Sequence, residues 1–175
     1  LPRPQLNVTD QRLTNGMFAL NQAPIVKRIA WPDELATQVF AQALAARSEI
    51  ANALIELQGD LGAGKTTFAR HLLAALGVHG RVKSPTYAVV EPYALDNGLN
   101  IWHFDFYRFN DPREWEEAGF RDIFASSGLK LVEWPDKAGE YLPQADLVLA
   151  IEVLADDTRQ VTLTAQTETG KALMT

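Results

Sequence analysis

Apolar residues in the first half of the chain change from helical spacing to a short strand-like run and back again. Acidic residues in Trp31-Pro32-Asp33-Glu34 suit the first turn of a helix, and apolar side chains then recur at helical spacing. We expect five of these to face the core: Leu35, Val39, Phe40, Ala43 and Leu44. Residues 52–57 (NALIEL) predict a buried strand ending before Gly59. Residues 65–76 predict a second helix, with Gly77 as its C-terminal cap.

Alternation typical of strands dominates the second half. Residues 86–92 and 99–107 flank the turn sequence Asp96-Asn97-Gly98, which predicts a hairpin. In the second run the aromatic residues at 102, 104 and 106 should lie in the core, while positions 101, 103, 105 and 107 should face a site or solvent. Residues 130–134 predict a further strand, and residues 147–154 with 161–165 predict a C-terminal hairpin.

The connection between these strands carries one more helix signal. Asp111 is suited to cap a helix that has Pro112 at its first position and ends near Gly119. Taken together, the elements predict one mixed α/β domain over residues 23–175, with β-hairpin additions. Residues 1–22 lack the basic-then-apolar layout of a secretory signal, and we predict that they form a flexible tail.

Composition narrows the function classes. Lysine and arginine total 16 against 22 acidic residues, giving a net charge of −6, which disfavours a broad electrostatic grip on nucleic acid. The absence of cysteine excludes disulfides, thiolate zinc sites and cysteine nucleophiles, and fits a reducing cytosol. No apolar run approaches the roughly 18 residues of a membrane helix. We therefore expect a cytoplasmic protein that does not insert into a membrane.

The clearest chemical motif is the glycine loop, residues 59–66 (GDLGAGKT), which matches G-x-x-x-x-G-K-[ST] in full. Backbone amides of such a loop wrap phosphate oxygens at the N-terminus of a helix, where the dipole favours anions. Lys65 would neutralise the β- and γ-phosphates, and the Thr66 hydroxyl would bind Mg²⁺. The predicted strand before the loop and helix after it are the context that this motif requires.

A magnesium ion at such a loop usually needs an acidic residue from a neighbouring strand. Asp105 and Glu133 both stand in apolar runs, where an unpaired carboxylate would be costly to bury. At least one of them should serve the metal, and the pattern does not choose between them.

Other polar residues have two interpretations each. The segment Ser84-Pro85-Thr86-Tyr87 is either a loop that senses the terminal phosphate or, as the residues alone favour, an ordinary turn. His103 is either a proton shuttle or a hydrogen-bonded structural residue, the commoner case. Three arginines could stabilise developing charge, but pairing with nearby acidic residues is the default: Arg108, Arg113 and Arg121.

The glycine loop alone leaves several classes of protein open. A GTPase is disfavoured because the guanine-specifying N/T-K-x-D element is absent. A small-molecule kinase remains an alternative, with the arginines between 108 and 121 as a lid. A nucleotide-gated binding module that needs no hydrolysis is a second alternative.

Four blocks along the chain narrow these choices. GDLGAGKTTFAR, VKSPTYAVVEPY, HFDFYR and LVEWP resemble, in order, the bacterial TsaE family. The resemblance implies a single P-loop NTPase-like domain with a mixed, mostly parallel sheet flanked by helices. It also implies an ATPase that supports formation of threonylcarbamoyladenosine on the tRNA base beside the anticodon. Such a protein acts on the complex of TsaD and TsaB without transferring the group, meets tRNA only through that complex, and hydrolyses ATP weakly alone.

The resemblance also assigns roles to individual residues. Lys65, Thr66, Asp105 and Glu133 form the implied catalytic set, with Mg²⁺ held by Thr66 and Glu133 and with Asp105 close by, where it contacts the metal through water or supports its ligands. Residues 84–87 form the implied switch-like loop. The residues implied to bind ATP are Glu34, Gly59, Asp60, Leu61, Gly62, Ala63, Gly64, Lys65, Thr66, Thr67, Thr86 and Trp134, with Glu34 toward the base or ribose.

Overall fold

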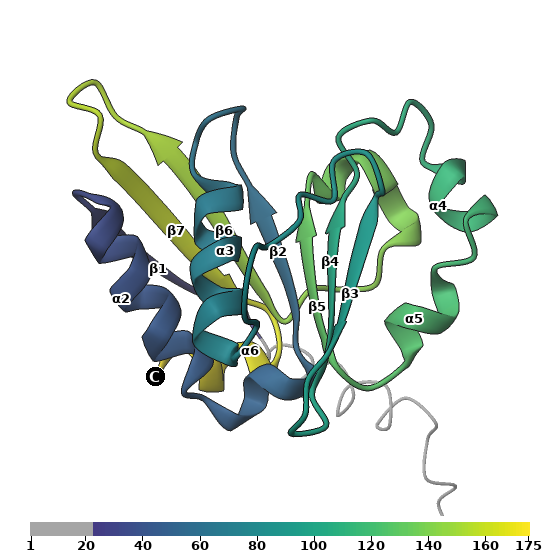
Figure 1. Cartoon of the computed structure of the whole chain (residues 1–175). Helices are drawn as coiled ribbons and strands as arrows, with labels where there is room; N and C mark the ends of the chain where they lie inside the picture. Colours follow the sequence, from purple (N-terminus) through teal and green to yellow (C-terminus); the bar gives the residue numbers. More distant parts are fainter. Residues whose placement is uncertain (1–22) are drawn as a thin grey trace, which may run out of the picture.

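One mixed sheet organises the molecule (Figure 1). The computed structural model describes residues 23–175, so the tail predicted for residues 1–22 lies outside the described residues. Within that part of the chain seven strands adopt the order β1-β7-β6-β2-β5-β4-β3. The strands are β1 (Ile25–Trp31), β2 (Leu54–Gln58), β3 (Val90–Ala94), β4 (Asn100–Asp105), β5 (Leu129–Glu133), β6 (Leu147–Val153) and β7 (Arg159–Ala165).

The centre of the sheet is parallel and its margins are antiparallel. Strands β6, β2, β5 and β4 run parallel to one another, whereas β7 pairs antiparallel with β6 and β1, and β3 pairs antiparallel with β4. All five residues of β5 are buried, as expected of a parallel strand covered on both faces. The predicted fold class is confirmed: a single α/β domain with a mixed sheet that is mostly parallel in its core.

Helices flank both faces of this sheet. The α-helices are α2 (Glu34–Ala45), α3 (Lys65–Leu76), α4 (Arg113–Glu117), α5 (Arg121–Ala125) and α6 (Glu168–Met174), and the 3₁₀ helices are η1 (Ser48–Asn52) and η2 (Pro135–Tyr141). In Figure 1, α2 and α3 lie side by side over one face, while α4 and α5 lie beyond β3 and β4. None of the helices in residues 23–175 is long and apolar enough to span a membrane.

Side chains that alternate along the strands pack into two hydrophobic cores, one on each face of the sheet. Ile55 and Leu57 of β2 pack with Phe68 and Leu72 of α3 in the first core. The second core, under α4, α5 and η2, is rich in aromatic residues: Phe104, Phe106, Phe109, Trp115 and Phe120. Strand β2 therefore sits between two packed layers, which fixes the position of the loop that follows it.

The predicted buried face of α2 is partly wrong. Leu44 is buried and Phe40 packs against the core as predicted, but Leu35 and Val39 are 64% and 56% exposed and Ala43 is exposed too. Thr37 and Ala41 turn inward in their place. The small Ala41 lets α2 approach α3, and apolar spacing alone did not distinguish this stripe from its neighbour. The start of the helix is as predicted, because the Asp33 carboxylate accepts a hydrogen bond from the Ala36 amide at 2.9 Å.

The side of β4 that was predicted to face a site or solvent does not face solvent within the strand. Phe104 and Phe106 are buried as expected, but Ile101, His103 and Asp105 on the other side are buried too. Ile101 packs in the first core and Phe104 and Phe106 pack in the second, so both faces of β4 are covered. This burial matters because the polar side of β4 leads directly to the glycine loop.

The remaining boundaries agree with the sequence pattern to within a few residues, with one exception. Helix α3 begins and ends where predicted, and Gly77 caps it in the left-handed region at φ 107°. Strand β3 begins at Val90, later than expected, because residues before it form a turn closed by the Val89 amide and the Pro85 carbonyl at 2.6 Å.

Candidate functional site

The glycine loop crosses from the carboxyl end of β2 to the N-terminus of α3. Gly59 has a φ of 151°, and a Cβ at this position would lie 2.6 Å from the Ile151 carbonyl oxygen. Only glycine allows the loop to pass this close to β6. Gly64 follows at φ 111° and leads into the first turn of α3, where backbone amides are free for an anion.

Lys65 lies across the mouth of the loop. Its ammonium donates hydrogen bonds to the Gly59 carbonyl and, at 2.9 Å, to the Asp60 carbonyl. The same Nζ lies 4.3 Å from the centre of the Trp134 ring. Burial lowers the pKa of Lys65, and the charges of nearby carboxylates, Glu133 first, oppose that shift. The loop thus holds a partly desolvated cation where a phosphate oxygen could exchange for its carbonyl partners.

Glu133 lies at the carboxyl end of β5 and is only 1% exposed. One of its carboxylate oxygens accepts from the Thr66 hydroxyl at 2.8 Å. The other oxygen lies 2.7 Å from His103 Nε2. His103 therefore has the hydrogen-bonded position of a structural residue, and it fixes the orientation of Glu133 from the neighbouring strand β4.

Asp105 ends β4 directly beside Glu133, its register partner on β5. Its carboxylate accepts from the Thr86 hydroxyl at 3.2 Å and from the Tyr107 amide at 2.9 Å. Burial raises the pKa of Asp105, the Tyr107 amide opposes this, and the charge of Glu133 raises it further. Two buried carboxylates at adjacent strand ends are the kind of oxygen donors that a magnesium ion takes.

Residues 84–87 form a turn, and this turn reaches the site. Ser84 Oγ lies 2.9 Å from Thr86 Oγ1, and Thr86 in turn contacts Asp105. Arg108 stacks its guanidinium 4.1 Å from the centre of the Tyr87 ring. The segment is therefore a turn, as the residues alone favoured, and the Thr86 hydroxyl contacts the Asp105 carboxylate.

These side chains surround a single cavity of about 280 Å³. It is lined by Leu61, Gly62, Gly64, Lys65, Thr66, Thr67, Thr86, Asp105, Tyr107, Glu133, Trp134 and Arg159. The structure thus brings together residues from the loop, from the ends of β4 and β5, and from the switch-like loop. This is the edge of a parallel sheet at which ligands commonly bind.

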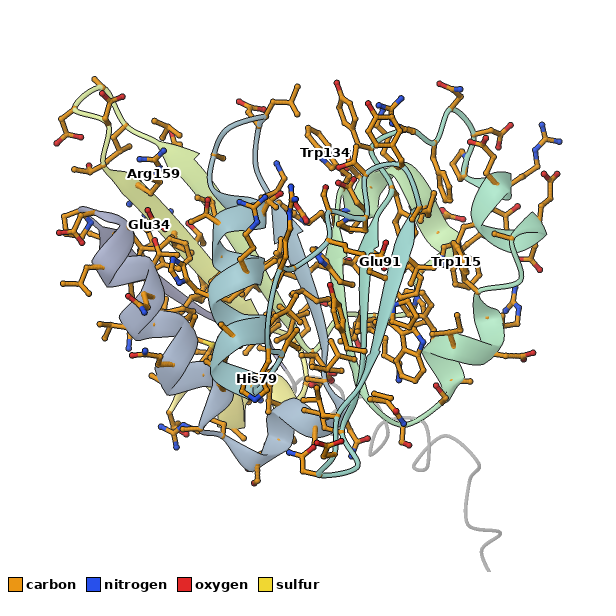
Figure 2. The ribbon with its side chains drawn as sticks, in the orientation of Figure 1. Glu34, His79, Glu91, Trp115, Trp134 and Arg159 are labelled. Carbon is orange, nitrogen blue, oxygen red and sulfur yellow. The ribbon has the colours of Figure 1, made fainter. Side chains whose placement is uncertain are left out.

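Glu34 lies outside that cavity. It lines an adjoining hollow of about 170 Å³ that shares Gly64, Thr67 and Arg159 with the first. Its carboxylate lies 3.0 Å from His71 Nε2. In Figure 2, Glu34 and Arg159 lie on one side of the glycine loop and Trp134 lies on the other. Glu34 therefore stands at one end of an elongated site.

The sequence analysis gave no role to two of the lining residues. Arg159 of β7 donates through Nε to the Ala63 carbonyl at 3.3 Å, and the Tyr107 ring packs 5.0 Å from the Trp134 ring. Strand alternation did place Tyr107, two positions after Asp105, on the side that faces a site or solvent. Arg159 had no local signal, because only sheet pairing brings β7 toward the loop.

The other arginines resolve into ordinary contacts. Arg113 pairs with Asp111 at 2.8 Å, and Arg121 pairs with Glu116 at 2.6 Å. Both pairs are largely exposed and stand apart from the cavity lining. The interpretation as ion pairs therefore holds for these two residues.

The chain is thus an α/β protein in which a glycine loop of the G-x-x-x-x-G-K-[ST] pattern joins a central parallel strand to a helix and is faced by acidic residues at neighbouring strand ends. A family model described as Threonylcarbamoyl adenosine biosynthesis protein TsaE matches residues 31–161. The chain belongs to this family, and the resemblance noted in the sequence is confirmed.

Individual relatives agree with this assignment. The tRNA threonylcarbamoyladenosine biosynthesis protein TsaE of Haemophilus influenzae is 46% identical over 121 residues, covering 69% of this chain and 75% of the relative. The protein of the same name from Bacillus subtilis is 38% identical over 144 residues, covering 80% and 87%. The crystal structure of Bacillus subtilis YdiB matches with a TM-score of 0.68 and 31% identity, covering 86% of this chain and 93% of that one.

Proposed function

We propose that this protein is a Mg²⁺-dependent ATPase that supports formation of threonylcarbamoyladenosine on the tRNA base beside the anticodon. Membership of the TsaE family supports the pathway. The chemistry is supported most by one observation: Thr66 and Glu133, 67 positions apart in the chain, meet at 2.8 Å beside Lys65. A loop that merely capped a helix would not need a buried carboxylate against its threonine.

ATP would enter with its phosphates along the glycine loop. Lys65 would exchange its two carbonyl partners for β- and γ-phosphate oxygens, which make stronger charge-assisted hydrogen bonds. The adjoining hollow beside Glu34 is in reach of the other end of the nucleotide, where the carboxylate suits ribose hydroxyls or an exocyclic amine. Arg159 lines both hollows, so it could contact the nucleotide where the nucleotide passes from one hollow to the other.

The oxygen donors present fit Mg²⁺. Mg²⁺ binds few protein oxygens and completes its shell with phosphates and water, and it supplies charge neutralisation for phosphoryl transfer. Thr66 and Glu133 would bind it directly, and Asp105 would reach it through water. Across residues 23–175 no group of three or more His, Cys, Asp or Glu side chains could hold a metal alone. The metal would therefore arrive with the nucleotide.

The partner in this proposal is the complex of TsaD and TsaB, with tRNA reached only through that complex, in the cytoplasm. Glu133 and Asp105 are the carboxylates that line the cavity, and this proposal assigns both to the metal, which leaves no lining carboxylate as a general base. Hydrolysis should therefore be slow until a partner completes the site, as trans-acting groups do in other NTPases.

Reconstitution tests this proposal. ATP turnover and tRNA modification should both rise when the protein is combined with TsaD and TsaB. Lys65→Ala should abolish both effects, whereas Lys27→Ala, which removes an exposed lysine from β1, should change neither. Equal ATP turnover with and without the partners contradicts partner activation. Full modification with a non-hydrolysable analogue favours the binding module, and phosphate transfer to a small molecule favours the kinase.

A further inference from the structure

A groove separate from the candidate site runs between α3 and the segment that follows it. Its cavity volume is about 860 Å³. Arg70, His71 and Ala74 of α3 form one wall, and residues 80–84 form the other. We define these residues as the basic groove. No residue of the glycine loop lines it, so it is not part of the cavity beside Lys65.

The basic groove carries a local positive charge on an acidic protein. Arg70, Arg81 and Lys83 are exposed, and the lining contains no Asp or Glu. Among the residues that the structure describes, none of these three cations forms an ion pair. Glu34 reaches across from α2 to His71, one of the lining residues, at 3.0 Å. Three unpaired cations on a chain of net charge −6 are electrostatically complementary to an anionic ligand, so we expect the ligand of this groove to be an anion.

The uncharged residues of the groove indicate which kind of anionic ligand it could bind. Ala74 and Val82 add apolar surface to the basic lining, and no aromatic side chain lines the groove. Single-stranded RNA is commonly bound by stacking its bases on aromatic side chains, and this groove has none. A peptide with an apolar side chain between carboxylates matches both the apolar and the basic part of the lining.

We propose that the basic groove docks an acidic segment of a protein partner, one that alternates carboxylate and apolar side chains. Its position favours a partner that acts on the candidate site. Ser84 lines the groove, and its hydroxyl lies 2.9 Å from that of Thr86, which contacts Asp105. Docking itself depends only on charge and shape. An effect on ATP turnover would in addition rest on the proposed function.

Binding of a fluorescein-labelled peptide of alternating Glu and Leu, measured by anisotropy without nucleotide, tests the docking. The double variant Arg81→Glu/Lys83→Glu should weaken binding by about tenfold or more. Both positions are exposed, so the fold should be kept, and thermal melts check this. The matched control Lys27→Glu/Arg28→Glu reverses two exposed charges on β1 and should leave binding unchanged.

Each result decides the question. Binding that only the groove variant weakens supports the proposal, and the same pattern with the purified TsaD–TsaB complex as probe identifies the partner. Absent peptide binding, or equal weakening by both double variants, overturns it. Groove-dependent binding of tRNA without peptide binding also overturns it and assigns the groove to RNA. Because no nucleotide is present, failure of the ATPase proposal leaves this test intact.

Discussion

Replacing Glu133 with glutamine distinguishes a role of this residue in metal binding from a role in folding. Glutamine keeps the shape of the side chain and can still meet Thr66 at one atom and His103 at the other. The negative charge is lost. If Glu133 binds Mg²⁺ directly, the variant should fold normally and lose its response to the metal.

The two expected effects have opposite signs. Losing a direct carboxylate ligand should weaken the affinity for Mg²⁺ by about 100-fold, which corresponds to about 2.7 kcal/mol of binding free energy. Glu133 and Asp105 are register partners on adjacent strands, roughly 5 Å apart, where like charges repel by at most about 3 kcal/mol at an effective dielectric of about 20. Nearby cations such as Lys65 offset part of this repulsion. The metal-free variant should therefore be as stable as the parent or about 1 kcal/mol more stable.

Thermal unfolding with ADP, with and without Mg²⁺, measures both effects. For a domain of this size, 1 kcal/mol corresponds to about 2–4 °C in Tm. Mg²⁺ should raise the Tm of the parent and leave that of Glu133→Gln almost unchanged. The control is Glu56→Gln, which removes a carboxylate from the other face of the sheet and should keep the full response.

A Glu133→Gln variant that retains the parental Mg²⁺ shift would refute the direct ligand and leave Asp105 as the better candidate. A variant that loses several kcal/mol without metal would show instead that the charge of Glu133 is needed for folding. In that case its contacts with Thr66 and His103 would be structural rather than preparation for a cation.

Three further predictions concern other features. Burial and the charge of Asp136 raise the pKa of Glu56 from 4.5 to about 7, so ionisation costs stability as pH rises through this range. Glu56→Gln should therefore gain about 1–3 kcal/mol in denaturant unfolding at about pH 8, and little at about pH 4. Gly170→Ala should destabilise the fold by about 2–4 kcal/mol, because its Cβ would lie 1.8 Å from the Asp146 carbonyl; an unchanged midpoint contradicts the packing of α6. Trp134→Phe should remove most of the fluorescence change on adding ADP, since Trp134 faces Lys65; a persistent change would assign the signal to another tryptophan.

Local patterns predicted the elements whose signals lie within a few residues. Helix α3 combined a full glycine-loop motif, helical spacing and a capping glycine, and both of its ends agree with the structure. Asp105 and Glu133 were found because a carboxylate in an apolar strand has few reasons to be there. Their contacts with Thr86 and Thr66 required the order of the strands, which no local pattern contains.

Long-range pairing explains what was missed. Strand β1 was not predicted. It is an edge strand that exposes its first four residues and buries only Trp31, so it lacks the alternation of apolar and polar positions by which a strand is found. Arg159 reaches the site only because β7 pairs with β6 beside the glycine loop. The inward stripe of α2 depended on how closely Ala41 allows it to approach α3, a matter of packing rather than of spacing.

The hydrogen-bonded path from Ser84 through Thr86 to Asp105 has a thermodynamic consequence. Any ligand of the basic groove that moves Ser84 changes the free energy of the carboxylate pair, and linkage is reciprocal. Metal and nucleotide must then alter the affinity of the groove by the same factor in return. A partner docked there would be released or retained according to the nucleotide state. Measuring the affinity of the groove for its ligand with and without Mg²⁺ and ADP therefore gives the coupling free energy between the groove and the site.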